Sequence, residues 1–150
     1  MIRVQREDFD PAAEIAALVG ANRRIGGVVS FVGLVREMAE GGAIAAMTLE
    51  HYPGMTERQL EAVVAEAEAR WPLDACLIVH RYGRLEPGER IVLAAVASSH
   101  RDAAFDACRF LVDWLKTKAP FWKLDEGPAG ARWVAEKAED QAAAARWAQK

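Results

Sequence analysis

The apolar positions of the chain fall into short runs rich in β-branched residues, separated by segments with a helical period. Five of these runs predict strands, and we expect the second of them to be buried: residues 2–5, 28–33, 44–52, 75–82 and 90–97. The turn residues at 86–89 join the last two runs and predict an antiparallel hairpin. Shorter extended segments are expected at 121–123 and 133–134, with a loop at 37–42 and a turn at 127–130.

Four segments have the features of helices. In the first, Asp10 is the expected N-cap, Pro11 occupies the first helical position, and Gly20 closes the helix. Thr56 is expected to cap the second helix, with Gln59 in the capping-box position. The third helix is predicted over 101–117, ended by Pro120, and an alanine-rich helix is predicted over 138–148.

The two long helices each carry one apolar face, which we expect to lie on the sheet. The second helix presents Leu60, Val63, Val64 and Ala67, and the third presents Ala104, Phe105, Cys108, Leu111, Val112 and Leu115. No repeat or linker divides the chain. The order of elements therefore predicts one α+β domain over residues 1–150, with helices packed on a mixed or antiparallel sheet.

The composition of the chain indicates a globular protein and excludes several other classes. The 150 residues carry a net charge of −3, with 52% hydrophobic and 27% charged residues, which is typical of a globular chain and not of a nucleic-acid binder. No apolar run approaches the roughly 18 residues of a membrane span, and the N-terminus lacks an apolar signal core, so we expect no membrane association and a cytoplasmic location. Cys76 and Cys108 fit no disulfide or zinc pattern and are expected in the core.

Charge is unevenly distributed along the chain. Residues 37–69 hold seven acidic residues and one basic residue, whereas 100–123 hold five basic and three acidic ones. Within the basic segment, Ser98-Ser99-His100-Arg101 stands where a strand gives way to a helix, so free N–H groups and two cationic side chains could bind a phosphate or carboxylate. An equally good interpretation is that Ser99 caps the helix while His100 and Arg101 face water.

The end of the same helix is the second candidate site. Lys116 and Lys118 are placed to complement the helix dipole, which is the usual role of lysines at a helix C-terminus. Lys123 follows the proline break beside Phe121 and Trp122, where partial desolvation favours acid–base chemistry. Arg36, just after a strand, is a weaker candidate. The chain has no nucleotide-binding, serine-hydrolase or zinc-protease motif, so any reactive nucleophile is expected to come with a substrate or partner.

Five stretches resemble one known family, in its order and spacing. They are Phe31-Val-Gly-Leu-Val-Arg36, Thr48-Leu-Glu-His-Tyr-Pro-Gly-Met-Thr56, His80-Arg-Tyr-Gly-Arg-Leu-Glu-Pro-Gly88, Ser98-Ser-His-Arg101 and Leu115-Lys-Thr-Lys-Ala-Pro-Phe-Trp-Lys123. The family is MoaE, the large, catalytic subunit of molybdopterin synthase. The resemblance implies an α/β hammerhead fold and a sulfurtransferase of molybdenum-cofactor biosynthesis. It also implies a small ubiquitin-like partner that carries sulfur as a C-terminal Gly-Gly thiocarboxylate, and a large-subunit homodimer within a heterotetramer. Two sulfurs would pass to cyclic pyranopterin monophosphate to form the dithiolene, with no metal or cofactor.

The resemblance also assigns roles to residues. Lys116 matches the family's catalytic lysine and Lys123 its second essential lysine. The substrate-binding positions match Leu34, Val35, Arg36, His100, Arg101, Lys116, Lys123, Leu124 and Asp125. Leu124-Asp125 departs from the basic residue and Glu that are usual there. The competing interpretations are a non-catalytic dimeric module that binds a small phosphorylated ligand or a partner's tail, and a structural scaffold.

Overall fold

The computed structural model describes residues 1–39, 42–128, 130–134 and 138–148, and it confirms an α+β fold. The helices are α1 (Pro11–Val19), α2 (Met55–Arg70), α3 (Arg101–Thr117) and α4 (Ala138–Ala145). The strands are β1 (Ile2–Gln5), β2 (Gly27–Leu34), β3 (Met38–Ala39), β4 (Gly42–Ala43), β5 (Ala46–His51), β6 (Ala75–Arg81), β7 (Gly83–Leu85), β8 (Arg90–Ser98), β9 (Phe121–Gly127) and β10 (Gly130–Trp133). No helix among these residues is long and apolar enough to cross a membrane.

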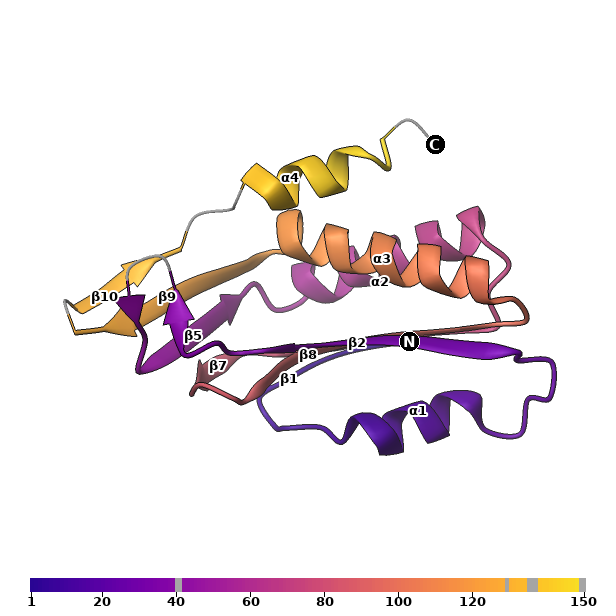
Figure 1. Cartoon of the computed structure of the whole chain (residues 1–150), viewed down its shortest axis with the longest axis horizontal. Coiled ribbons are helices and arrows are strands. Elements are labelled where there is room, and N and C mark those ends of the chain that lie inside the picture. Colours follow the sequence, from indigo (N-terminus) through magenta and orange to yellow (C-terminus); the bar gives the residue numbers. More distant parts are fainter. Residues whose placement is uncertain (40–41, 129, 135–137, 149–150) are drawn as a thin grey trace.

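The first sheet has the strand order β1-β6-β8-β2 and lies between two layers of helix (Figure 1). β6 and β8 pair antiparallel, which confirms the predicted hairpin, whereas β1 joins β6 in parallel and makes the sheet mixed. Helices α2 and α3 cover one face, where Leu60, Ile78 and Leu111 belong to the main core. On the other face Leu18 of α1 packs against a smaller core that contains Phe9 and Leu93.

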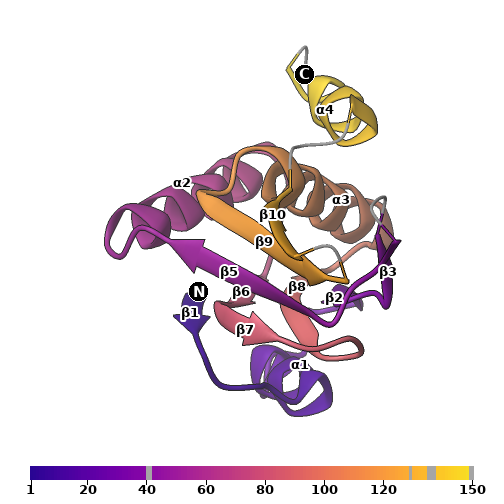
Figure 2. The ribbon, with the colours of Figure 1, turned by 90° about the vertical axis from the view of Figure 1, so that its left-hand side faces the viewer.

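The second sheet is antiparallel throughout, in the order β10-β9-β5-β7, and stands beyond one end of the first (Figure 2). Gly83, at φ 96°, lies where the chain leaves β6 for β7 and so changes sheet. Val35, Leu49 and Leu85 form the buried cluster of this region. Because Ile91 packs against both this cluster and the main core, the two sheets share a continuous interior.

The ends of α1 and α2 test the two capping predictions. The carboxylate of Asp10 accepts a 3.0 Å hydrogen bond from the Ala12 N–H, as expected. The prediction that Thr56 caps α2 is wrong. The helix begins two residues earlier, with Gly54 as N-cap, and Thr56 is buried inside its first turn, where its hydroxyl donates to the Tyr52 carbonyl at 2.8 Å.

Three other sequence expectations need correction. β2 is an edge strand of the first sheet, so most of its residues are half-buried and not buried as predicted. Segment 37–42 is not simply a loop, because β3 and β4 pair within it, although residues 40 and 41 lie outside the described part, as does residue 129 of the predicted turn. On α3 the buried face is rotated: Phe105 is 59% exposed, and Ala103, Ala107 and Phe110 are buried in its place.

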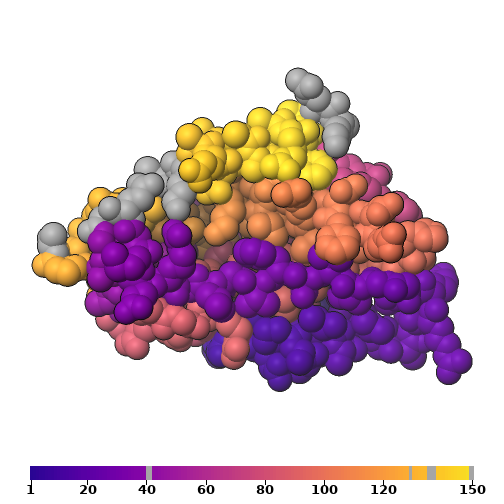
Figure 3. Space-filling view, in the orientation of Figure 1, coloured from indigo at the N-terminus to yellow at the C-terminus, as the bar shows by residue number. Residues whose placement is uncertain are grey.

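The terminal helix lies on the outer side of α3 (Figure 3). Just after α4, Trp147 is buried against the rings of Trp71 and Phe110, and its indole N–H donates to a carboxylate oxygen of Asp113 at 2.7 Å. A cavity of about 470 Å³ lies between α2, α3 and this segment. The tail is therefore attached to the body by an aromatic anchor with a satisfied polar atom.

Candidate functional site

Lys116 and Lys123 lie on either side of the break between α3 and β9. Lys116 is exposed in the last turn of α3, which ends at Lys118 with a 2.8 Å bond from its N–H to the Trp114 carbonyl. Pro120 prevents further helix, and the chain resumes in β9 with Lys123 half-buried opposite Leu49 of β5. The short connection brings the two ammonium groups to one end of the first sheet.

A buried histidine of the first sheet lies within electrostatic reach of both lysines. The imidazole of His80, near the end of β6, donates from Nδ1 to the Arg81 carbonyl at 2.8 Å, because that oxygen can only accept. Burial lowers the pKa of His80 to about 3, and the charges of Lys123 and Lys116 act in the same direction. Both lysines are thus within electrostatic reach of one imidazole, which stays neutral at physiological pH.

Aromatic rings hold this end of the molecule together. Phe121 lies face to face with His80, at 3.7 Å between ring centroids, and also contacts His51 at 5.8 Å. His51 in turn packs against Tyr82 and hydrogen-bonds through Nδ1 to the Thr56 hydroxyl at 3.1 Å. These contacts show that His51 packs within the aromatic cluster at this end of the molecule.

The segment that carries Arg36 lies at the same end of the first sheet. β2 ends beside the start of β8, where Leu34 pairs with Arg90, and α3 runs antiparallel to β8, so its last turn lies over this edge. Val35 is buried and its main chain is bonded on both sides, whereas the side chains of Leu34 and Arg36 are exposed. The structure thus places Arg36 at the same end as the two lysines.

His100 and Arg101 lie at the opposite end of α3. His100 is the N-cap residue but makes no capping bond with its side chain, and Ser99 does not cap either, because its hydroxyl donates to Asp74 at 3.4 Å. The side chains of His100 and Arg101 are both exposed. Since a helix rises 1.5 Å per residue, Arg101 is about 22 Å from Lys116 along the axis. One chain therefore does not bring all the predicted basic residues into a single cleft.

Glycine at position 26 shapes the turn before His100. The Gly26 N–H donates to the Ser98 carbonyl at 2.9 Å, and a Cβ atom at position 26 would overlap the carbonyl oxygen of Ser99. The start of β2 and the turn before α3 are in direct main-chain contact here.

Leu124 and Asp125 continue β9 beyond Lys123. Leu124 is half-buried, whereas Asp125 is 6% exposed and shares the face of Phe121 and Lys123, since alternate residues of a strand point the same way. Among the described residues its Oδ1 atom has no hydrogen-bond partner. Burying an acceptor without a donor costs free energy. This unpaired oxygen belongs to Asp125, two residues after the candidate lysine Lys123.

The cysteines offer no nucleophile. Cys76 and Cys108 are free and buried in the main core, as predicted, and burial raises their pKa values to about 12 and about 11. In the described part of the chain no three His, Cys, Asp or Glu side chains come close enough to hold a metal ion. Of the site residues, sequence reasoning overlooked His80, although it opens one of the five family-like stretches.

The cavities do not coincide with the lysines. Neither the cavity beneath the tail nor a second one of about 460 Å³ between β2 and α3 is lined by Lys116 or Lys123. Their position at an exposed end of the sheet leaves the lysines accessible to another chain.

Comparison with known proteins gives consistent matches. The family model described as MoaE protein matches residues 4–118. The molybdopterin synthase catalytic subunit of Pseudomonas aeruginosa is 56% identical over 146 residues, which cover 97% of each chain. Among solved structures, the molybdopterin biosynthesis MoaE protein of Burkholderia ambifaria has a TM-score of 0.84 at 52% identity and covers 98% of this chain and 97% of that one. Molybdopterin synthase from Staphylococcus aureus has a TM-score of 0.82 at 30% identity over 89% of this chain and 96% of that one.

Proposed function

This chain belongs to the MoaE family, and we propose that Lys116 and Lys123 form the centre at which it carries out the family's sulfur transfer. Its function is that of a molybdopterin synthase catalytic subunit. Sulfur passes in two successive transfers from the C-terminal thiocarboxylate of a small ubiquitin-like partner to cyclic pyranopterin monophosphate. The catalytic role of its curated relatives disfavours the alternative of a non-catalytic binding module.

The observation that carries the proposal is the convergence of both lysines on the neutral imidazole of His80. Lys116 is exposed and so accessible to the partner's tail, whereas Lys123 is half-buried and shares one face of β9 with Phe121. An ammonium group at Lys116 would stabilise the negative charge that develops on the oxygen of a tetrahedral intermediate, and could deliver a proton to the departing group. Lys123 would activate the pterin. The buried, protonated thiols of Cys76 and Cys108 fit a reaction in which the partner supplies the sulfur.

Arg36 is proposed to bind the anionic part of the pterin from the same chain, with Leu34 and Val35 shaping the segment around it. The exposed guanidinium suits a phosphate, because it can donate two parallel hydrogen bonds. Leu124 and Asp125 are proposed to complete this side, with the unpaired Oδ1 of Asp125 as an acceptor for a pterin N–H group.

His100 and Arg101 are proposed to serve the site of a second copy of the chain. Arg109 is midway between the ends of α3, beside the cavity between α3 and the edge strand β2. A two-fold axis passing there would set the two α3 helices antiparallel. The second copy's Arg101 would then approach Lys116 of the first.

The surface beside Arg109 supports this dimer. Phe105 and Phe31 line the cavity, and Phe105 is exposed in the single chain. A second copy on this face would cover the exposed ring of Phe105. The homodimer thus completes two equivalent sites.

We further propose that residues 1–150 form one domain and that the protein is cytoplasmic. The shared packing of Ile91 supports the first statement, and two unpaired cysteines fit the reducing compartment of the second.

The test is reconstitution. Wild-type protein is mixed with thiocarboxylated small subunit and cyclic pyranopterin monophosphate, and molybdopterin is measured against a reaction that contains the small subunit with an ordinary carboxylate. We expect product only with the thiocarboxylate. Absence of product from a folded protein that binds the small subunit would refute the proposed activity.

A further inference from the structure

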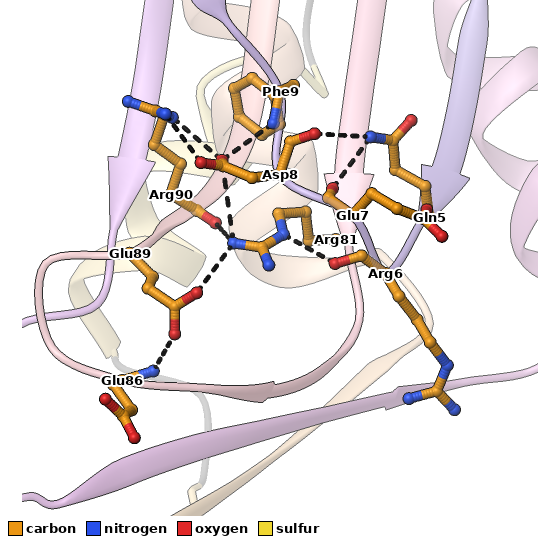
Figure 4. A network of polar contacts seen from close by, with 9 residues as sticks. All are labelled: Gln5, Arg6, Glu7, Asp8, Phe9, Arg81, Glu86, Glu89 and Arg90. Atoms are coloured by element: carbon orange, nitrogen blue, oxygen red, sulfur yellow. Dashed lines mark hydrogen bonds and ion pairs between the residues drawn. The ribbon is translucent and has the colours of Figure 1, made fainter.

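Arg81, at the end of β6, is a buried guanidinium surrounded by acceptors (Figure 4). Its Nε donates to the Arg6 carbonyl at 2.9 Å, and its Nη1 donates to the Arg90 carbonyl at 3.0 Å. The same nitrogen lies 3.4 Å from a carboxylate oxygen of Glu89 and 3.9 Å from one of Asp8. A buried charge with this number of partners holds the segments that supply them in a defined geometry.

Glu89 connects this network to residues 34–36, the segment proposed to bind the pterin. The second carboxylate oxygen of Glu89 accepts from the Glu86 N–H at 2.6 Å, which closes the turn between β7 and β8. The Glu89 carbonyl accepts from the Val35 N–H at 2.9 Å, and the Gly88 N–H donates to the Val35 carbonyl at 2.8 Å. Arg36 follows directly, so the turn that Arg81 orders also fixes the main chain before Arg36.

His80 makes the corresponding link on the other side. Its ring is 12° from parallel with Phe121, the first residue of β9, and Phe121 and Lys123 share one face of that strand. The Nδ1 bond to the Arg81 carbonyl fixes the ring plane of His80. Movement of this imidazole would therefore shift the start of β9 and, with it, Lys123.

We propose that His80 and Arg81 are a pair of positioning residues that set the two halves of the site from one strand end. His80 places Lys123 through the ring of Phe121, and Arg81 places Arg36 through Glu89 and Val35. Neighbouring residues of a strand point to opposite faces, so His80 and Arg81 can position Lys123 and Arg36 on different sides of the same strand end. The inference rests on the proposed roles of Lys123 and Arg36, and it assigns distinct kinetic effects to the two residues.

For Arg81 the expected effect is on pterin binding. Arg81→Met should raise KM for cyclic pyranopterin monophosphate about tenfold with little change in kcat, because misplacing a binding group weakens capture of the substrate. Arg84→Met is the matched control, since Arg84 is a half-exposed arginine of the same hairpin that pairs with Glu86 and Glu126. Glu89→Gln, which keeps Arg81 but weakens its ion pair, should also raise KM for cyclic pyranopterin monophosphate. It replaces Arg81→Met in this test if that variant folds poorly. Hydrogen exchange at the Val35 and Gly88 amides should accelerate in both variants and not in the control.

For His80 the expected effect is on the chemical step. His80→Ala should lower kcat about tenfold with KM within about twofold, and His80→Phe, which restores a ring against Phe121, should recover most of the loss. Equal activity of the Ala and Phe variants would overturn the link through Phe121. If every variant lost kcat and gained KM together, in proportion to the fall in its Tm, the two residues would have a merely structural role. That result would overturn the proposed positioning pair.

Failure of the proposed function and failure of the positioning roles of His80 and Arg81 give different results. If wild-type protein makes no molybdopterin, the proposed function falls whatever these variants do. If wild type is active and both His80→Ala and Arg81→Met match it in kcat, KM and amide exchange, only the positioning inference falls.

Discussion

The imidazole of His80 and the ring of Phe121 lie face to face, with centroids 3.7 Å apart and planes 12° from parallel. This contact joins the first sheet to the second at the point where Lys116 and Lys123 approach. Burial keeps the imidazole neutral, so it adds no positive charge beside the two ammonium groups. The candidate site therefore rests on an uncharged pair of aromatic rings, His80 and Phe121, with the ammonium groups of Lys116 and Lys123 nearby.

Lys116→Ala should abolish most of the molybdopterin synthesis while leaving the fold intact. Its side chain is exposed, so little packing is lost, whereas removal of an acid–base or charge-stabilising group typically costs about 10²- to 10⁴-fold in kcat. The measurement is single-turnover product formation with thiocarboxylated small subunit.

Lys118→Ala is the control for this experiment. Lys118 is also exposed and only two residues away at the C-cap of α3, yet we assign it no role beyond the helix dipole, so activity should stay within about twofold of wild type. Equal loss in both variants would mean that general positive charge, and not Lys116, matters.

Co-expression of two inactive chains tests whether sites are shared between copies. A Lys116→Ala chain and an Arg101→Ala chain should together recover up to about a quarter of wild-type activity, because half of the dimers are mixed and each mixed dimer has one intact site. If Arg101 served its own chain's Lys116, no mixed dimer would contain an intact site and activity would stay at the level of the single variants.

Stability should fall with acid in a way that depends on His80. The folded pKa of His80 is about 3 and its ordinary value is 6.5, so between these values the unfolded chain binds the proton and the folded chain does not. The free energy of unfolding should therefore drop as pH falls below 6.5, with a limiting slope from this group of about 1.4 kcal/mol per pH unit. Urea unfolding of wild type and His80→Phe from about pH 6.5 to 5, where carboxylates remain ionised, should show the shallower dependence in the variant. Parallel curves would contradict a buried neutral His80.

Thiol reagents should leave the folded protein active. Burial raises the pKa values of Cys76 and Cys108 to about 12 and about 11, so at about pH 8 neither thiol is ionised or accessible. Ellman's reagent should titrate both cysteines only after unfolding, and a preincubated native sample should make molybdopterin at the untreated rate. Rapid labelling with loss of activity would revive a cysteine mechanism.

The strands and helices were largely predictable because their signals are local. Asp10, Pro11 and Gly20 delimit α1 as expected, and Pro120 ends the helical region as expected. The predictions failed where tertiary contacts, and not local sequence, determine how a side chain is used. Thr56 is a good capping residue, but its hydroxyl is used inside the helix by Tyr52 and His51, and the free N–H of Gly54 is satisfied by Glu57 instead.

The sequence supplies candidate residues for the site, which remain a prediction, but it does not give their arrangement in space. The basic residues of 100–123 are close in sequence, yet α3 separates Arg101 from Lys116 by about 22 Å, because helical distance grows with every residue. Phe105 fits the helical period of the buried stripe but lies outside it, and only the position of the edge strand β2 explains an exposed aromatic residue there. His80 was overlooked because its importance depends on Phe121, 41 positions later in the chain.

Gly26 has no side chain and takes no part in the chemistry, yet it limits how this protein can vary. A single methyl group at that position would collide with the Ser99 carbonyl, main chain against main chain, with no rotamer available to relieve it. Even Gly26→Ala, among the smallest of substitutions, would therefore push away the turn that presents His100 and Arg101. Position 26 is thus restricted to glycine by the main chain of the turn before α3, although it takes no part in the chemistry.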